Sequence, residues 1–230
     1  STELDTTGEA IATESLPSLL NSPDHQLFDE LVDKYALQSG LSGVQPKVML
    51  EATRAENTTL RTHNYIVKSW GNDYPQLAAN EYFCMSVARA AGLETSEFFL
   101  SDNGRLFIME RFDKTSDKVC FGFEDGCVLQ GLAPKNKYDG SYEGLAKSLH
   151  TYISPQNRSK SMKQLFISLT VSWAVQNGDA HLKNFGILYD HPFGNRLLAP
   201  GFDIDGEPLP MERKVGIIAD DVKAAIAGED

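Results

Sequence analysis

One short polar loop, residues 177–185, gathers residue types that can do chemistry. It reads Asn-Gly-Asp-Ala-His-Leu-Lys-Asn-Phe and lies between an apolar helical segment and an apolar strand-like segment. A carboxylate such as that of Asp179 can accept the proton of a hydroxyl group, and the amide oxygen of Asn184 can bind Mg²⁺. One irregular loop can aim both groups into the same cleft, which is what phosphoryl transfer to a hydroxyl requires. Taken alone, the loop is equally compatible with a solvated connection that carries a capping Asp.

A second carboxylate follows shortly afterwards, at Asp203 in Pro200-Gly201-Phe202-Asp203. Mg²⁺ takes few ligands from protein when phosphate oxygens are present, so Asn184 and Asp203 would suffice. Asp205 would share a face with Asp203 in an extended segment. Seen in isolation, either residue is compatible with a plain turn aspartate.

The N-terminal half contains residues that could contact phosphate groups. Gly40-Leu41-Ser42-Gly43 precedes a strand and could offer backbone N–H groups, although it is neither a GxGxxG nor a Walker A motif. Lys68 ends the apolar strand Tyr65-Ile66-Val67-Lys68, and Glu81 in the next helix could pair with it. Protein kinases place a loop, a strand lysine, a helix glutamate, a catalytic loop and a metal-binding Asp in this order. A charged residue such as Lys68 at the end of an apolar strand is usually just solvated. The order of these elements along the chain, more than any single residue, favours a function for Lys68.

The hydrophobic periodicity predicts an α+β, two-lobed fold with a β-rich N-terminal lobe, a helical C-terminal lobe and a nucleotide cleft between them. Residues 1–24 are expected to form a tail or linker, 25–112 the N-terminal lobe and 113–230 the C-terminal lobe, with the junction near 110–114. Helices are expected over 25–35, 76–91 (ending at Gly92), 142–149 and 160–176. Strands are expected over 48–50, 64–68, 97–100, 105–112, 185–189 and 197–199, with an Asn103-Gly104 turn and a polar hairpin or loop between the first two strands.

Composition excludes several classes of protein. The 21 Lys and Arg residues stand against 32 Asp and Glu residues, a net charge of −11, which argues against a broad basic face for direct nucleic-acid binding. Three cysteines without a CxxC pair argue against a disulfide framework or a zinc site. With no apolar run long enough for a membrane span and no signal-peptide pattern, a cytoplasmic protein that makes no membrane contact is expected.

Four motifs together resemble the HipA family of bacterial serine/threonine kinases, the toxin kinases of toxin–antitoxin modules and their relatives. They are Ser42-Gly43-Val44-Gln45-Pro46-Lys47, Glu110-Arg111-Phe112-Asp113, the loop 177–185, and Leu198-Ala199-Pro200-Gly201-Phe202-Asp203. The resemblance covers about residues 37–205 and is closer to the short HipT-type or orphan YjjJ-type branch than to HipA itself. It implies an ATP- and Mg²⁺-dependent protein kinase, a protein substrate such as an aminoacyl-tRNA synthetase, and a DNA-binding antitoxin as partner.

The resemblance also implies roles for single residues. Asp179 would be the catalytic base, and Asn184 and Asp203 would hold Mg²⁺. Glu81 would be the partner of Lys68. The nucleotide would be bound by Ser42, Gly43, Val44, Gln45, Pro46, Lys47, Lys68, Glu110, Arg111, Phe112, His181, Lys183 and Asn184, with Glu110 and Phe112 offering backbone groups to adenine.

Two departures from the family pattern carry consequences. The family often writes the phosphate loop as Ser-Ile-x-Gly, whose serine is autophosphorylated, and that position is Gly40 here; Ser42 is therefore the expected alternative site of autophosphorylation. Only residues 204–230 follow the metal-binding Asp, fewer than the family usually has, so the C-terminal lobe is expected to be short.

Two other functions remain open at this point. A kinase-shaped binding module that has lost catalysis could serve as an antitoxin or scaffold, but the presence of Lys68, Asp179, Asn184 and Asp203 favours the enzyme. A phosphotransferase acting on lipids or small molecules would share the Asp-x-His-x-x-Asn pattern, but no basic amphipathic face for a membrane is visible.

Overall fold

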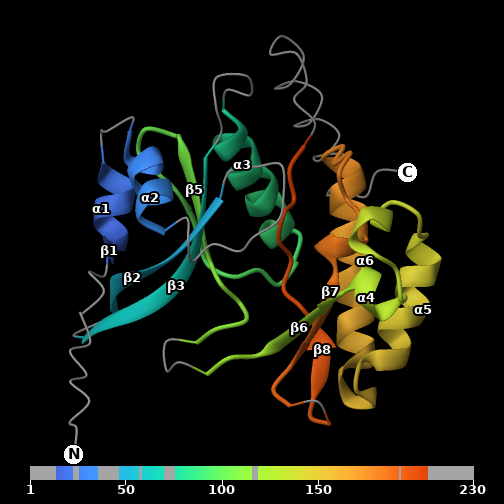
Figure 1. Cartoon of the computed structure of the whole chain (residues 1–230). Coiled ribbons are helices and arrows are strands. Elements are labelled where there is room, and N and C mark those ends of the chain that lie inside the picture. Colours follow the sequence, from blue (N-terminus) through green and yellow to red (C-terminus); the bar gives the residue numbers. More distant parts are fainter. Residues whose placement is uncertain are drawn as a thin grey trace, which may run out of the picture.

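The computed structural model describes residues 14–22, 26–35, 47–56, 59–69, 76–115, 119–191 and 193–206. Two sheets organise this part of the chain, a five-stranded sheet of order β1-β2-β3-β5-β4 and a three-stranded sheet of order β6-β7-β8. In Figure 1 the five-stranded sheet and its helices lie on one side, and the three-stranded sheet with α5 and α6 lies on the other. The α+β, sheet-first architecture expected from the sequence is confirmed.

The five-stranded sheet is built around a long hairpin, which is larger than expected. Its strands β2 (Lys47–Glu56) and β3 (Thr59–Ser69) are antiparallel and continue into the segment for which a polar hairpin or loop was expected, so the hairpin alternative is the one present. Charges that face each other across the hairpin support the extension, because Glu56 in β2 lies 3.0 Å from His63 Nε2 and 3.5 Å from Arg61 Nε in β3. The sheet is completed by β4 (Phe98–Leu100), β5 (Leu106–Glu110) and the short β1 (Glu14–Ser15), which runs parallel to β2.

Helices cover both faces of this sheet. On one face lie α1 (Leu16–Asn21) and α2 (Leu27–Tyr35), and on the other lies α3 (Leu77–Ala90) (Figure 1). Side chains alternate along β5 accordingly: Leu106 and Ile108 pack with α1 and α2, whereas Phe107 and Met109 pack with α3. The sheet therefore separates two apolar cores.

The expectation of a tail over residues 1–24 is wrong for its final part. Ser15 caps α1 by accepting a hydrogen bond from Ser18 N at 3.2 Å, and Pro17 occupies a favourable first-turn position. Leu16 and Leu19 are buried in the core against β2. Because the surrounding sequence is polar, the hydrophobic pattern did not reveal that Leu16 and Leu19 anchor this short helix.

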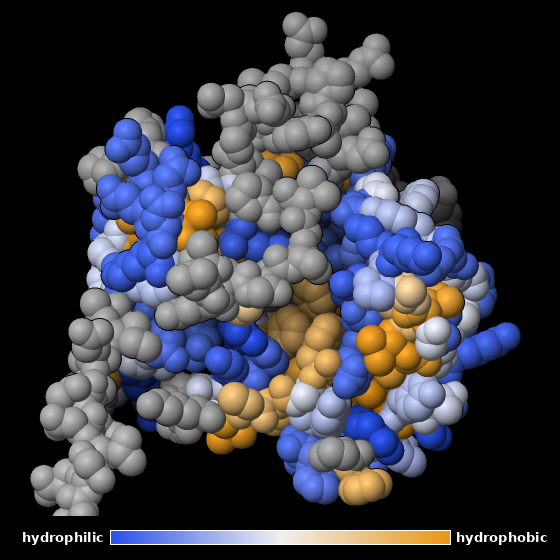
Figure 2. Space-filling model, viewed as in Figure 1, coloured by the Kyte–Doolittle hydropathy of each residue, from blue (hydrophilic) through white to orange (hydrophobic). Residues whose placement is uncertain are grey.

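The helical half surrounds a third core. It contains β6 (Gly122–Asp125), α4 (Gly126–Leu129), α5 (Tyr142–Tyr152), α6 (Arg158–Ala174), β7 (Gly186–Tyr189), β8 (Arg196–Leu198) and three-residue 3₁₀ turns at Pro134–Asn136, Pro155–Asn157 and Leu182–Asn184. Leu145, Leu149 and Leu165 from α5 and α6 pack with Leu182 and Phe185 from the polar loop. The loop is thus fastened to this core by its own apolar residues. Figure 2 shows a shaded recess between the two halves, with apolar residues at its floor.

The C-terminal ends of α3 and α6 lie close to their predicted positions. α3 ends at Ala90, one residue before the predicted end, and Gly92 just beyond it has the left-handed φ of 89°. α6 ends at Ala174, and the left-handed residue that follows is Gln176 (φ 56°) rather than Gly178. No helix in the ranges given above is both long and apolar enough to cross a bilayer.

Candidate active site

A buried lysine forms the centre of the candidate site. Lys68 lies near the end of β3 on the face that α3 covers, and its Nζ lies 2.6 Å from Glu81 Oε1. Both residues are almost fully buried, Lys68 at 4% exposure and Glu81 at 1%. A buried charge requires a partner, so α3 and the sheet must pack in this register for either residue to be tolerated. The structure therefore brings together the two residues that the sequence paired.

The same ammonium group also contacts Asp203, 135 residues further along the chain. Lys68 Nζ donates a hydrogen bond to Asp203 Oδ1. Asp203 has a left-handed φ of 53°, which is unusual for a residue with a side chain and is typical of functional segments. The segment before it is tied to the N-terminal half, because Gly201 N donates to Glu94 O at 2.7 Å.

The charges around Lys68 set the protonation of the site. Burial by itself would lower the pKa of Lys68, but Asp203 and Glu81 together raise it, so the lysine is charged. Burial would raise the pKa of Asp203, and the Lys68 charge and hydrogen bond lower it overall. Burial raises the pKa of Glu81 to about 7 against the influence of Lys68. The Lys68 ammonium group thus outweighs the effect of burial on the ionised form of Asp203, but it offsets only part of that effect on Glu81.

A second lysine faces the same place. Lys47 in β2 is the cross-strand neighbour of Lys68 in the sheet. Burial and the nearby Lys68 and Lys183 lower the pKa of Lys47, while Asp203 and Glu81 oppose this shift. Lys47 is the last residue of the expected phosphate loop; Ser42, Gly43, Val44, Gln45 and Pro46 lie outside the described residues.

The loop 177–185 is folded by hydrogen bonds between its own residues. Asp179 N donates to Asn177 Oδ1 at 3.0 Å, and His181 N donates to Asn184 Oδ1 at 2.9 Å. The side chain of Asp179 is 60% exposed and faces His181, whose Nε2 lies 3.9 Å from Asp179 Oδ2. Burial and Lys137 lower the pKa of His181, so the imidazole is neutral near pH 7.

Two further residues at Asp179 escaped the sequence analysis. The hydroxyl group of Tyr138 donates to Asp179 Oδ1, and Lys137 Nζ lies 3.8 Å from the same oxygen. The stretch Lys135-Asn136-Lys137 reads as an ordinary solvated loop in the sequence. This stretch lies beside Asp179 because Leu182 N donates a hydrogen bond to Lys137 O at 3.1 Å. No local sequence pattern predicts that contact.

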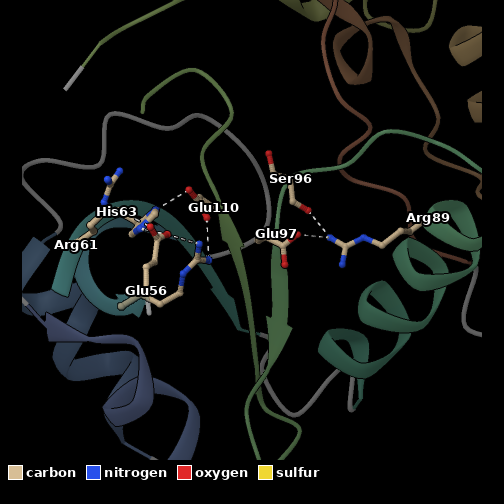
Figure 3. Close-up of polar contacts among 8 residues, drawn as sticks. Glu56, Arg61, His63, Arg89, Ser96, Glu97 and Glu110 are labelled. Carbon is tan, nitrogen blue, oxygen red and sulfur yellow. Dashed lines mark hydrogen bonds and ion pairs between the residues drawn. The ribbon is translucent and has the colours of Figure 1, made fainter. Parts of the chain in front are cut away.

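The junction after β5 differs in part from expectation. Glu110 N donates to Glu97 O and Arg111 N donates to Asn64 O, each at 2.8 Å, so neither N–H is available to adenine. The Glu110 carboxylate is held by the hairpin, 2.7 Å from His63 Nδ1, beside Glu56 and Arg61 (Figure 3). The guanidinium group of Arg111 pairs with Asp113.

Phe112, at the junction after β5, packs against two other aromatic residues. Its ring packs against Phe202 at 5.2 Å and Phe123 at 5.5 Å between ring centroids. Phe202 precedes Asp203, so the aromatic cluster connects the junction to the segment that carries the acidic residue. Of the predicted adenine contacts, the backbone of Phe112 and the carbonyl group of Glu110 remain candidates.

Lys183 turns toward a neighbouring acidic residue. Its Nζ lies 4.0 Å from Asp125 Oδ2. Asp125 also caps α4 by accepting hydrogen bonds from Cys127 N at 2.9 Å and Val128 N at 3.0 Å. Asp125 is a further charged residue at this edge of the site that the sequence analysis did not assign.

The residues present fit a divalent cation by their chemistry. The carboxylate of Asp203 and the amide of Asn184 supply the oxygen donors that Mg²⁺ prefers. Burial and the neighbouring Asp203 and Asp179 raise the pKa of Asp205 to about 6 against the opposing effect of Lys68. A bound cation would offset the effect of the two neighbouring carboxylates on Asp205. In the described ranges no three acidic, His or Cys side chains form a complete metal site by themselves.

Comparison with known proteins gives consistent matches. The model of the HipA-like C-terminal domain matches residues 39–223. The chain is 30% identical over 186 residues to "Putative kinase Y4mE" of Sinorhizobium fredii, covering 76% of this chain and 44% of that protein. It is 28% identical over 189 residues to a "Putative kinase" of Haemophilus influenzae, covering 74% and 53%. The chain thus spans about half the length of these relatives.

Two solved structures share the fold. One is HipA of Shewanella oneidensis in complex with HipB and its operator DNA, with a TM-score of 0.53, 21% identity, and coverage of 73% of this chain and 43% of that one. The other is the Helicobacter pylori proinflammatory kinase CtkA, with a TM-score of 0.51, 20% identity, and coverage of 72% and 55%. Together with the match over residues 39–223, these likenesses establish that the chain belongs to the HipA-like C-terminal domain family and has a HipA-type kinase fold.

Proposed function

We propose that this protein is an ATP- and Mg²⁺-dependent kinase that transfers the γ-phosphoryl group to a serine or threonine hydroxyl of a protein. The observation that carries the proposal is the convergence of Lys68, Glu81 and Asp203 from β3, α3 and the segment after β8. Burying these charges is costly, and clusters of buried ionisable groups that shift one another's pKa are concentrated at functional sites.

The positions suggest a role for each residue. Lys68, oriented by Glu81, would contact the nucleotide phosphates from the sheet, with Lys47 beside it and the segment Ser42–Pro46 covering them. Asn184 and Asp203 would hold Mg²⁺, which supplies charge neutralisation at the transferred phosphoryl group. His181 and Lys183 would line the nucleotide side of the loop.

Asp179 would accept the proton of the attacking hydroxyl group. Its carboxylate is exposed enough to meet a protein substrate, and hydrogen bonds between residues of the loop fix the backbone that carries it. A general base contributes about 10² to 10⁴ to the rate.

The partners belong to the same proposal. Family resemblance suggests an aminoacyl-tRNA synthetase as substrate and a DNA-binding antitoxin as partner, and the Shewanella HipA structure contains HipB and operator DNA. The net charge of −11 is compatible with DNA contacts made by such a partner rather than by this chain. Self-modification at Ser42 also stays a proposal.

Labelled ATP tests the function directly. Purified protein is incubated with Mg²⁺ and labelled ATP, with dephosphorylated casein or phosphoinositide vesicles as acceptors. We expect transfer to casein and a loss of about 10² to 10⁴ in rate for Asp179→Asn, which removes the proton acceptor and little volume.

Other outcomes would favour the alternatives. Nucleotide binding without turnover in wild type would indicate a binding module, and transfer to vesicles alone would indicate a lipid phosphotransferase. Turnover by Asp179→Asn close to the wild-type rate would remove Asp179 from the catalytic role.

A further inference from the structure

The hydroxyl group of Tyr138 occupies a distinctive position, because it donates a hydrogen bond to Asp179 Oδ1. If Asp179 is the base, a substrate hydroxyl must make this same hydrogen bond before it attacks. The Tyr138 side chain is nevertheless 60% exposed, and so is that of Asp179. The contact is therefore exposed to solvent and is not a buried structural bond.

The segment that carries Tyr138 is fixed against the catalytic loop. The carbonyl group of Lys137 accepts a hydrogen bond from Leu182 N at 3.1 Å, and Asp139 N donates to Asn136 O at 3.0 Å. The ring of Tyr138 lies edge-on to His181, with 5.4 Å between the ring centroids. Hence the hydroxyl group is held at Asp179 by both its backbone and its ring.

The surroundings also suit a phosphorylated product. Lys137 Nζ lies 4.7 Å from the centroid of the Tyr138 ring and 3.8 Å from Asp179 Oδ1. A phosphate on Tyr138 would carry about −1.5 to −2 charges, which Asp179 would repel and Lys137 could pair with.

We propose that Tyr138 is an intramolecular acceptor, a tyrosine that the protein phosphorylates on itself when no other substrate occupies the site. The proposal rests on the proposed kinase function. In the reaction Tyr138 Oη forms a bond to the γ-phosphorus as the bond to the β,γ-bridging oxygen breaks. ADP leaves, and the phenol proton passes to Asp179. Phosphorylation then removes the tyrosine from the base by charge repulsion.

A matched pair of tyrosine variants tests this inference. Tyr142, the first residue of α5, is also half-exposed, but its hydroxyl group donates to the carbonyl group of Ala180 at 2.8 Å and not to a carboxylate. Wild type, Tyr138→Phe, Tyr142→Phe and Asp179→Asn are incubated with Mg·ATP at several protein concentrations. Phosphorylated sites are mapped by peptide mass spectrometry, and transfer to dephosphorylated casein is measured in parallel.

We expect phosphate on Tyr138 in wild type and Tyr142→Phe, at a rate independent of protein concentration, and none at that site in Tyr138→Phe or Asp179→Asn. An unmodified Tyr138 in protein that phosphorylates casein would overturn the inference and leave the kinase function intact. The inference would also be overturned if Tyr138→Phe phosphorylated casein faster than wild type while wild-type Tyr138 carried no phosphate. The tyrosine would then only obstruct the site. Absence of all transfer would instead overturn the proposed function. Phosphate at Ser42 is resolved separately by the same peptide map.

Discussion

At the scale of single residues, one ammonium group lies between two carboxylates. Lys68 contacts both Glu81 and Asp203, and the two acids differ in their access to water: Glu81 is 1% exposed, whereas the Asp203 side chain is 38% exposed. Asp203 can therefore exchange Lys68 for another cation without being stranded in the interior, and Glu81 cannot. Under the proposed function, this asymmetry would suit Glu81 to orienting the lysine and Asp203 to meeting the ligand.

The two acidic residues after β8 should differ in function. Because Asp203 contacts Lys68, Asp203→Ala should weaken Mg·ATP binding or turnover more than Asp205→Ala. Removing one of two protein ligands of a metal typically costs more than removing a neighbour that only adds negative charge. Nucleotide titrations at several Mg²⁺ concentrations measure the difference. The reverse ranking would move the metal ligand to Asp205, and two negligible effects would remove this segment from the site.

Glu81 should make stability depend on pH. Its pKa rises from the ordinary 4.5 to about 7 in the fold, so between these values the folded chain holds a proton that the unfolded chain has lost. The free energy of unfolding should therefore fall as the pH rises through this window, by up to about 3 kcal/mol at about 1.4 kcal/mol per pKa unit. Glu81→Gln should lack this decline.

Denaturant titrations from pH 4 to 8 measure the difference between wild type and Glu81→Gln. Glu30→Gln on the exposed face of α2 is the matched control and should run parallel to wild type. Parallel curves for wild type and Glu81→Gln would show that Glu81 is ionised throughout the range.

Local spacing foresaw only some of these contacts. Lys68 and Glu81 follow from a strand end and the next helix, and the structure pairs them at 2.6 Å. The contact between Tyr138 and Asp179 spans 41 residues and depends on how the segment before α5 folds back. Glu110 is a second example, because its N–H donates to the carbonyl group of Glu97. This contact depends on strand pairing, which local sequence patterns do not predict.

At the scale of elements, the sequence predicted which segments are helical better than which face they bury. The predicted helix over 160–176 is present as α6, but Phe166 and Trp173 are 70% and 82% exposed. Its buried positions instead include Ser161, Ser168 and Ser172. Leu165 and Val171 of the same helix are also buried, so its inward side combines apolar residues with small residues that allow close approach of neighbouring elements.

A glycine at the start of α4 should be essential for the placement of the catalytic loop. A Cβ added at Gly126 would lie 2.6 Å from the carbonyl oxygen of Leu182 and 2.8 Å from Leu145 Cδ1. Because the first of these atoms belongs to the loop backbone, Gly126→Ala should cost about 1 to 3 kcal/mol and lower turnover by moving the loop.

Gly144→Ala supplies the control for this prediction. Gly144 lies inside α5, and its added Cβ would meet only a flexible side chain, Gln130 Oε1, at 3.2 Å. Alanine should therefore be neutral or stabilising by up to about 1 kcal/mol. Thermal unfolding and casein phosphorylation measure both effects, and an equal response of the two variants would contradict the proposed close contact.

At the scale of the whole molecule, the candidate site lies where separately packed cores meet. Lys68 and Glu81 belong to the sheet and α3, whereas Asp179 and Asn184 belong to a loop anchored in the helical half by Leu182 and Phe185. The contact between Lys68 and Asp203 and the bond from Gly201 N to Glu94 O join the two halves. Glu94 adds two more contacts to α6, an ion pair with Lys160 at 2.6 Å and a hydrogen bond from its N–H to Gln164 Oε1 at 2.7 Å. A ligand that binds both halves should add to these contacts and stabilise the entire chain.

Mg·ATP should therefore raise the unfolding temperature more than ATP in the presence of EDTA. A ligand at about 100 times its Kd adds about 2.7 kcal/mol, equivalent to roughly 5–10 °C for a chain of this size. The increase should depend on Mg²⁺, because without the cation the phosphates would meet neighbouring carboxylates. Burial, together with Asp203 and Asp179, raises the pKa of Asp205 to about 6. Asp203→Ala should lose the Mg²⁺-dependent part and keep any part due to ATP alone. Equal shifts with and without Mg²⁺ in wild type would mean that the nucleotide is held by the sheet-side lysines alone, and the cation site would then have to be sought elsewhere in the protein.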